Sequence, residues 1–183
     1  MAGRLLRRRT AAAVVAYAVV TSTLLALSGC ADEEKASYLR TETGRLVVDR
    51  PSAWATPFEV EAPWTSGYRA APDSVEQIQL SGDFGEFVTA SEAVGTLIGK
   101  AQVSLRDFKV VQSRDLTVKG ATTGRATQYT FTANGGSQLT GEWIVAAHWP
   151  YPQSVAVSIL TPTFDPDLER RVIDSLEMHA VES

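Results

Sequence analysis

This chain of 183 residues contains only two histidines and one cysteine, the residue types that most often bind zinc. Its two histidines, His148 and His179, are not spaced for joint metal binding and have no thiolate partner. Asp83 and Glu86 could pair as an acid and a base, but the glycines beside them favour a turn. The sequence therefore predicts no metal site.

Patterns for a nucleophile or a phosphate site are also missing. The chain has no Gly-x-Ser-x-Gly sequence, although a Ser-His-Asp site is defined by geometry and the sequence leaves it open. Gly95, Gly99 and Lys100 do not match a phosphate-binding loop, because the glycines of such a loop precede a helix and these lie within one. We therefore predict neither an enzyme nor a bound cofactor.

Aromatic residues in or beside predicted loops are better candidates for function. Aromatic side chains in such places can form a binding surface, or they can cap the ends of the core. Trp54 directly follows the first expected strand, so we expect it in the core. The candidate binding patch consists of Trp64, Tyr68, Trp149 and Tyr151.

The N-terminal residues have the layout of a secretory signal. Arg4 and Arg7–Arg9 form a basic start, residues 11–27 form an apolar run, and Leu27-Ser28-Gly29-Cys30 follows. An uncleaved membrane helix is one alternative, but the run is at the short limit for spanning a bilayer. A chance cysteine after small residues is another. We interpret residues 1–29 as a cleaved signal.

This N-terminal segment resembles bacterial lipoprotein precursors at Leu27–Cys30. The resemblance implies that the Cys30 thiol is acylated and that cleavage occurs between Gly29 and Cys30. Two acyl chains are sufficient for stable attachment to a membrane. The chain is therefore expected at the extracytoplasmic face of the cell membrane, with the membrane as a partner through its N-terminal lipid.

Composition limits what the exported part can do. Cys30 is the only cysteine, so after lipidation no thiol remains for a disulfide or for thiolate catalysis. Removing the signal takes away four arginines and no acidic residue, which changes the formal net charge from −4 to about −8. An acidic domain without a basic run argues against a nucleic acid partner.

Residues 30–43 are polar and charged, and we interpret them as the lipidated N-terminus and a flexible tether. Residues 44–183 predict one α+β domain. The alternation of apolar residues predicts strands over 44–50, 58–61, 75–80, 108–118, 124–132, 138–148 and 155–160. Loops are expected over 64–74 and 149–152, and turns at 82–85 and 134–136.

Two amphipathic helices are expected in addition. A capping box at Thr89–Glu92 begins the first, which ends near Val103–Leu105. Asp165-Pro166 begins the second, with an N-cap followed by proline at the first helical position. Successive strands joined by tight turns favour an antiparallel sheet, and the helices are expected to cover it.

The order of these elements resembles the PsbP-like family and, within it, the LpqN-type lipoproteins of actinobacteria. Residues 46–54, 141–145, 164–165 and 173–176 carry the likeness. It implies an α/β/α sandwich around an antiparallel sheet, but no single function. Plant and cyanobacterial members are accessory subunits of photosystem II, and other members are envelope lipoproteins thought to bind partners or small molecules.

Our leading expectation is a non-enzymatic, membrane-anchored binding or accessory domain for a protein partner or an apolar small molecule. One alternative is a lipid or small-molecule carrier, which needs an internal apolar cavity. Another is an envelope hydrolase, which needs a nucleophile, a base and an oxyanion site within reach of one another.

Overall fold

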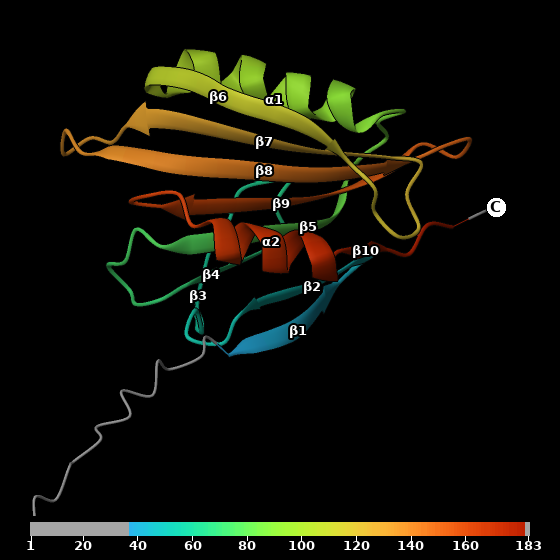
Figure 1. Cartoon of the computed structure of the whole chain (residues 1–183), viewed down its shortest axis with the longest axis horizontal. Helices are drawn as coiled ribbons and strands as arrows, with labels where there is room; N and C mark the ends of the chain where they lie inside the picture. Colours follow the sequence, from blue (N-terminus) through green and yellow to red (C-terminus); the bar gives the residue numbers. More distant parts are fainter. Residues whose placement is uncertain (1–36, 182–183) are drawn as a thin grey trace, which may run out of the picture. The chain divides into compact units, whose positions relative to one another are not determined.

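The computed structural model describes residues 37–181, which form ten strands and two helices (Figure 1). The predicted signal, Cys30 and the first half of the predicted tether lie outside the described residues. No helix of the described part is long and apolar enough to cross a bilayer. Lys35–Ser183 form one compact unit.

A seven-stranded sheet is the centre of the fold, and all its neighbouring strands are antiparallel, as expected. The strand order is β3-β4-β5-β9-β8-β7-β6. The bounds are β3 Thr56–Phe58, β4 Ser66–Arg69, β5 Gln77–Gly85, β6 Arg106–Leu116, β7 Thr123–Thr132, β8 Gln138–His148 and β9 Gln153–Thr161.

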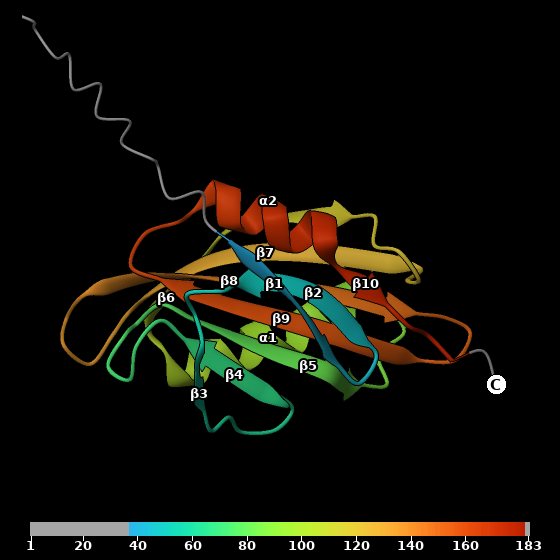
Figure 2. The ribbon, with the colours of Figure 1, turned by 90° about the horizontal axis from the view of Figure 1, so that it is seen from below.

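The two faces of this sheet are covered differently (Figure 2). Helix α1 (Ala90–Ser104) lies on one face. Helix α2 (Pro166–Ser175) and a second antiparallel sheet lie on the other. The second sheet has the order β1-β2-β10, with β1 Tyr38–Thr43, β2 Leu46–Pro51 and β10 Glu177–Met178. The α+β class is confirmed, and one covering layer combines a helix with strands.

Both helices begin where their capping residues predicted. The Thr89 hydroxyl accepts a hydrogen bond from the Glu92 amide at 3.2 Å, and the Glu92 carboxylate accepts one from the Val88 amide. The Asp165 carboxylate accepts hydrogen bonds from the amides of Asp167 and Leu168, both at 3.0 Å. These contacts satisfy amides that have no partner within a first helical turn.

Strand β8 contributes to two cores, because its successive side chains point to opposite faces. Trp143 and Val145 pack on the α1 side, whereas Ile144 and Ala146 pack on the α2 side. This alternation agrees with the strand that the sequence predicts over residues 138–148. Trp54 is buried in the α2-side core, as expected.

Four local expectations are corrected by the structure. The strand expected over 58–61 is instead β3, which ends at Phe58. Residues 38–43 belong to the fold as β1, so the domain begins before residue 44. The expected loop over 64–74 contains β4. The expected turn at 82–85 is the last part of β5, where Gly82 lies so close to Thr43 that a β-carbon would overlap its carbonyl. Tertiary pairing therefore outweighs local sequence preference at these segments.

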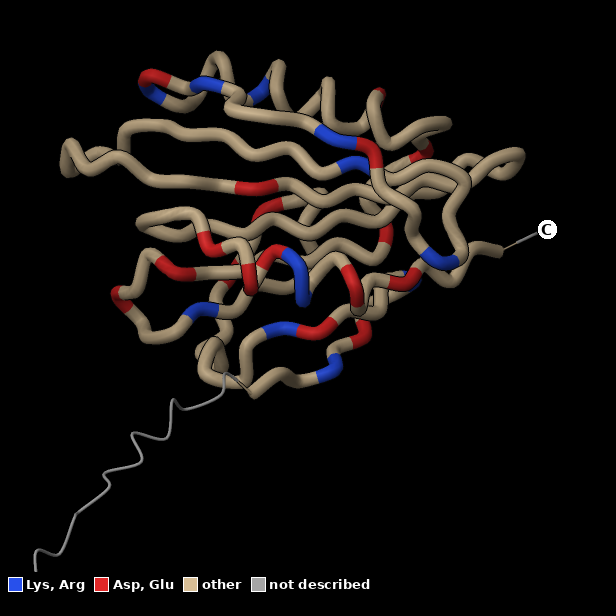
Figure 3. Tube along the Cα trace, viewed as in Figure 1, with Lys and Arg blue, Asp and Glu red and all other residues tan. Residues whose placement is uncertain are grey.

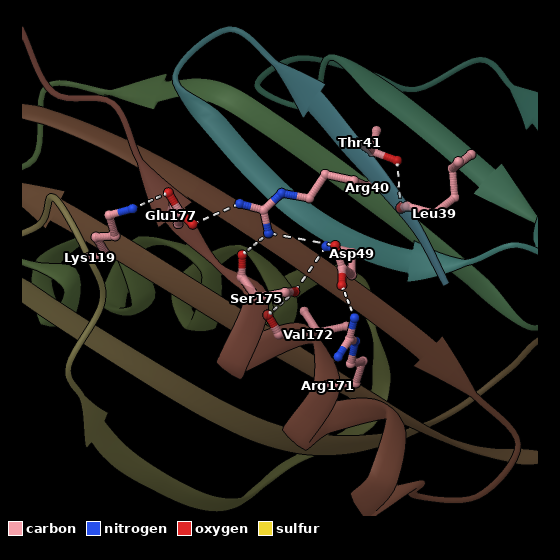
Figure 4. Close-up of polar contacts among 9 residues, drawn as sticks. All are labelled: Leu39, Arg40, Thr41, Asp49, Lys119, Arg171, Val172, Ser175 and Glu177. Carbon is pink, nitrogen blue, oxygen red and sulfur yellow. Dashed lines mark hydrogen bonds and ion pairs between the residues drawn. The ribbon is translucent and has the colours of Figure 1, made fainter. Parts of the chain in front are cut away.

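Hydrogen bonds and an ion pair join the small sheet to α2 (Figure 4). Arg40, on β1, donates to the Ser175 carbonyl at 2.7 Å and to the Glu177 carboxylate at 2.8 Å. Arg171, on α2, donates to the carboxylate of Asp49, on β2. Because Arg40 comes from the segment expected to be a tether, that segment helps to hold α2 in place.

Candidate binding groove

The four aromatic residues of the candidate patch lie in different environments. Trp64 packs at the edge of the α1-side core, 5.5 Å from the ring of Phe84. Tyr68 packs against the α2-side core beneath the Arg50 guanidinium, 4.0 Å from it. Trp149 and Tyr151 are about half exposed in the turn between β8 and β9. The expected single patch is thus divided, and only Trp64 lines a groove.

This groove, of about 390 Å³, lies between α1 and the connection from β3 to β4. One wall is the C-terminal half of α1 with Leu105; the other is residues 61–64, which include Trp64. Leu97 and Ala101 face the sheet because the amphipathic pattern of α1 buries that side. The remaining wall residues are Lys100 and Ser104 on α1 and Glu61, Ala62 and Pro63 opposite.

The floor of the groove is an aromatic pair on neighbouring strands. The rings of Tyr129, on β7, and Trp143, on β8, are stacked with centroids 4.0 Å apart. Phe108, on β6, lies 5.5 Å from Tyr129 and 6.0 Å from Trp143. Gln79 and Ser158 line the groove together with this pair and add polar atoms to its floor.

Gly141 makes room for this floor. It is directly opposite Tyr129 in the β7–β8 pairing, and a β-carbon at that position would overlap the phenol ring. Burial raises the pKa of Tyr129 to about 12, although a hydrogen bond with Ser158 acts in the other direction. The phenol therefore stays neutral at ordinary pH and is a hydrogen-bonding group rather than a charge.

The chemistry of the groove is that of a binding site. Its walls and floor are aromatic and aliphatic, and two exposed charged residues of opposite sign, Glu61 and Lys100, lie at the rim. A volume of this size is within the range of small-molecule sites, which combine apolar walls with a few polar groups. The groove suits an apolar or aromatic group with a polar end.

The residues considered for catalysis do not come together among the described residues. His148 is half-buried at the end of β8, and its Nδ1 has no hydrogen-bond partner; His179 is exposed. Asp83 pairs with Arg45 at 3.0 Å rather than with Glu86. Within residues 37–181, no three His, Cys, Asp or Glu side chains are arranged to hold a metal ion.

A buried carboxyl pair on the opposite face was missed by sequence reasoning. Glu142, on β8, is 4% exposed and lies against Glu169 of α2, which accepts a hydrogen bond from Arg114 at 2.6 Å. Burial, together with a hydrogen bond to Glu169 and its charge, raises the pKa of Glu142 to about 9. Burial alone would raise the pKa of Glu169, but the hydrogen bonds from Glu142 and Arg114 lower it.

The two carboxyls therefore share one proton at neutral pH. The space around them holds only about 10 Å³, roughly the room for one water. A substrate could not reach them, so this pair is a structural feature rather than a second site. A sequence signal existed, because Glu142 is the one charged residue of β8 (Figure 3).

Sequence comparisons give no match: no known protein-family model and no curated protein matches this chain. Solved structures do match in fold. The Ran-binding protein Mog1p of Saccharomyces cerevisiae has a TM-score of 0.52 and 10% identity, over 79% of this chain and 96% of that chain. Cyanobacterial PsbP of Synechocystis sp. PCC 6803 has a TM-score of 0.53 and 13% identity, over 84% and 99%.

The fold is therefore PsbP-like, as the resemblance in the sequence implied. LpqN of Mycobacterium tuberculosis, described as involved in cell envelope biogenesis, has a TM-score of 0.48 and 10% identity, over 81% of this chain and 88% of that chain. A TM-score of 0.48 is too low to establish a shared fold. At such identities the similarity concerns architecture, and architecture does not determine function.

Proposed function

We propose that this chain is a lipid-anchored, extracytoplasmic binding domain that holds an apolar group in the groove between α1 and residues 61–64. The observation that carries the proposal is the open groove of about 390 Å³ with its stacked Tyr129–Trp143 floor. Anchoring is supported by the sequence Leu27-Ser28-Gly29-Cys30 behind a basic and apolar start. The bound group belongs to a small molecule or to a protein partner.

A binding role has a precedent in this fold. The yeast protein with a TM-score of 0.52 is named as a Ran-binding protein, so the architecture can serve protein recognition. Because no family model matches the chain, the class of ligand has to be inferred from the residues that line the groove. Because the floor is aromatic and the rim carries Lys100 and Glu61, an amphipathic occupant fits best.

The alternatives find less support in the geometry of the described residues. A carrier would enclose an apolar chain, whereas the groove is open and the space between β8 and α2 holds only about 10 Å³. A hydrolase needs a base next to a nucleophile, and neither His148 nor His179 makes a side-chain hydrogen bond to another described residue.

The groove is tested with 1-anilinonaphthalene-8-sulfonate, an amphipathic aromatic dye, on Lys35–Ser183. Trp64→Ala removes one wall and should weaken dye binding several-fold, with little change in the unfolding midpoint because Trp64 is only half-buried. Trp149→Ala is the matched control, since Trp149 is exposed outside the groove. Equal dye affinity in the wild type and the Trp64 variant would exclude this groove as the site.

Anchoring is tested separately on the full chain in a bacterial host with lipoprotein processing. Mass spectrometry of the purified N-terminus should find Cys30 as the first residue and carrying acyl chains, whereas Cys30→Ser should retain the signal. An unmodified Cys30 thiol would contradict anchoring and leave the groove proposal in place.

A further inference from the structure

A second hollow, of about 300 Å³, lies at one end of the α2 face and shares no residue with the binding groove. It is formed by the start of β1, the end of β2 and the turn after it, the residue before β5, the end of β9 and the first turn of α2. Figure 2 shows that β1 and α2 begin at the same end of the molecule. Tyr38, the second described residue, lines the hollow, so the chain enters the domain beside it.

Two aromatic side chains line this hollow. Trp54 is only 7% exposed, so the α2-side core fixes its position, and Tyr38 is half-buried. The π electrons of an aromatic ring attract a cation placed over its face. The Tyr38 ring already makes such a contact, because the Arg171 guanidinium lies 5.3 Å from its centroid. The charge of Arg171 is balanced by its ion pair with Asp49.

The charged residues that line the hollow are both acidic. Glu76 and Asp165 line it, and none of its described lining residues is basic. Neither carboxylate forms an ion pair with another described residue. Burial raises the pKa of Tyr38 and the negative charge of Asp165 raises it further, so the phenol stays neutral beside that carboxylate. The hollow therefore suits a positive ligand.

Neither an anion nor a metal ion fits the hollow as well. The amides at the start of α2 would attract an anion, but the Asp165 carboxylate already accepts hydrogen bonds from two of them. Calcium takes six to eight oxygen ligands, and no three His, Cys, Asp or Glu side chains are arranged for a metal within residues 37–181. An organic cation can instead place its alkyl groups against the apolar lining residues, which are Tyr38, Pro51, Ala53, Trp54, Pro162 and Leu168.

We propose that this hollow binds an organic ammonium ion, with the charged nitrogen near Glu76 and Asp165 and the alkyl groups against Trp54 and Tyr38. A small ammonium ion makes few contacts in an open hollow, so its binding is weak and its exchange with solvent is fast. The site is separate from the groove beside α1, and its chemistry does not depend on what the groove holds.

The source of the ammonium group is a lipid head group or a free ammonium compound. Tyr38 follows Cys30 by eight residues, and an extended chain of that length spans at most about 30 Å. With Cys30 lipidated, ammonium head groups at the membrane surface are therefore within reach of the hollow. This step, unlike the binding chemistry, rests on the proposed anchoring.

Titration of Lys35–Ser183 with choline, followed by heteronuclear NMR at constant ionic strength, tests the site. The amide signals of Tyr38 and of residues 161–163 should shift and saturate. The neutral analogue 3,3-dimethylbutan-1-ol has the shape of choline without its charge and should bind at least about fivefold more weakly. Equal binding of the two compounds, or no saturable shift at these residues, would overturn the proposal.

Two substitutions separate the carboxylate from the aromatic contribution. Glu76→Gln should weaken choline binding about two- to fivefold, because Glu76 is exposed and its charge is screened. Glu42→Gln is the matched control, since Glu42 is an exposed glutamate on β1 that does not line the hollow. Tyr38→Leu should weaken binding to a similar extent, whereas Tyr38→Phe should preserve it. Unchanged choline affinity in both Glu76→Gln and Tyr38→Leu, with unfolding midpoints like that of the wild type, would contradict the proposal.

Co-sedimentation of Lys35–Ser183 with vesicles distinguishes the two sources. A preference for phosphatidylcholine over phosphatidylglycerol vesicles that Tyr38→Leu abolishes would assign the site to lipid head groups. Saturable choline binding without that preference would assign it to free ammonium compounds. An unmodified Cys30 in the full chain would remove the membrane as the source and leave the choline titration as the test of the site.

Discussion

The two faces of the seven-stranded sheet are formed by the same strands but differ in their side chains and in the space left between them. The α1 face is aromatic and open: Trp64, Tyr129 and Trp143 line a groove of about 390 Å³. The α2 face is mainly aliphatic and is closed around Glu142, with Ile144, Val157 and Val172 buried and about 10 Å³ of space there. A hollow of about 300 Å³ lies at its margin, beside Tyr38, Trp54 and Leu168. The difference indicates that one face supplies a binding surface while the other holds the fold together.

The largest expected effect is on the pH dependence of the free energy of unfolding, through the proton held by Glu142 and Glu169 on the α2 face. The pKa of Glu142 is about 9 in the folded state, against 4.5 for an ordinary glutamate, because of burial and its contact with Glu169. Between these values the folded state binds one proton more than the unfolded state. Stability should therefore fall as pH rises from about 4.5 to 9, by at most roughly 1 kcal/mol per pH unit for this one proton.

Glu142→Gln tests this directly, because glutamine copies the protonated carboxyl and cannot ionise. Urea unfolding between pH 5 and 9 should show a falling stability for the wild type and a flatter profile for the variant. Glu177→Gln is the control, since Glu177 is partly exposed and the contacts from Lys119 and Arg40 lower its pKa. A wild-type profile that is flat over this range would refute the shared proton.

A smaller effect is expected where the two faces meet on β8. Gly141→Ala places a methyl group against the ring of Tyr129, and such overpacking costs about 1–3 kcal/mol. Displacement of that ring should also weaken dye binding in the groove. Gly135→Ala is the control, because a β-carbon there meets no atom within 4 Å. If Gly141→Ala has the same free energy of unfolding and the same dye affinity as the wild type, the aromatic floor forms without the room that this glycine leaves.

Much of the fold could be predicted from local patterns. Thr89 and Asp165 mark helix starts, Asn134-Gly135-Gly136 marks a hairpin, and the alternation along β8 gives its two faces. These features are encoded by residues close in sequence. By its sequence, strand β1 resembles a tether, because it is polar and its stability comes from pairing with β2 and from the contacts of Arg40.

The site was predictable only in part. Trp64 was a candidate, but Tyr68 lies under Arg50 on the other side of the sheet, which depends on how β4 pairs with β5. The groove floor was not foreseen, since Tyr129 and Trp143 come together only through the register of β7 with β8. Sequence indicates which residues can bind, and long-range pairing decides which of them meet.

The smallest expected effect is at the rim of the open face. Lys100 is exposed beside the groove, so its charge should contribute only about 0.2–1 kcal/mol to binding an anionic dye such as 1-anilinonaphthalene-8-sulfonate. Lys100→Met keeps the apolar stem and should weaken dye binding slightly, whereas Lys100→Arg should preserve it. The wild-type affinity should fall with added salt, and the Met variant should lose that salt dependence. If Lys100→Met binds as tightly as the wild type at low salt, the groove recognises the apolar part of its occupant alone.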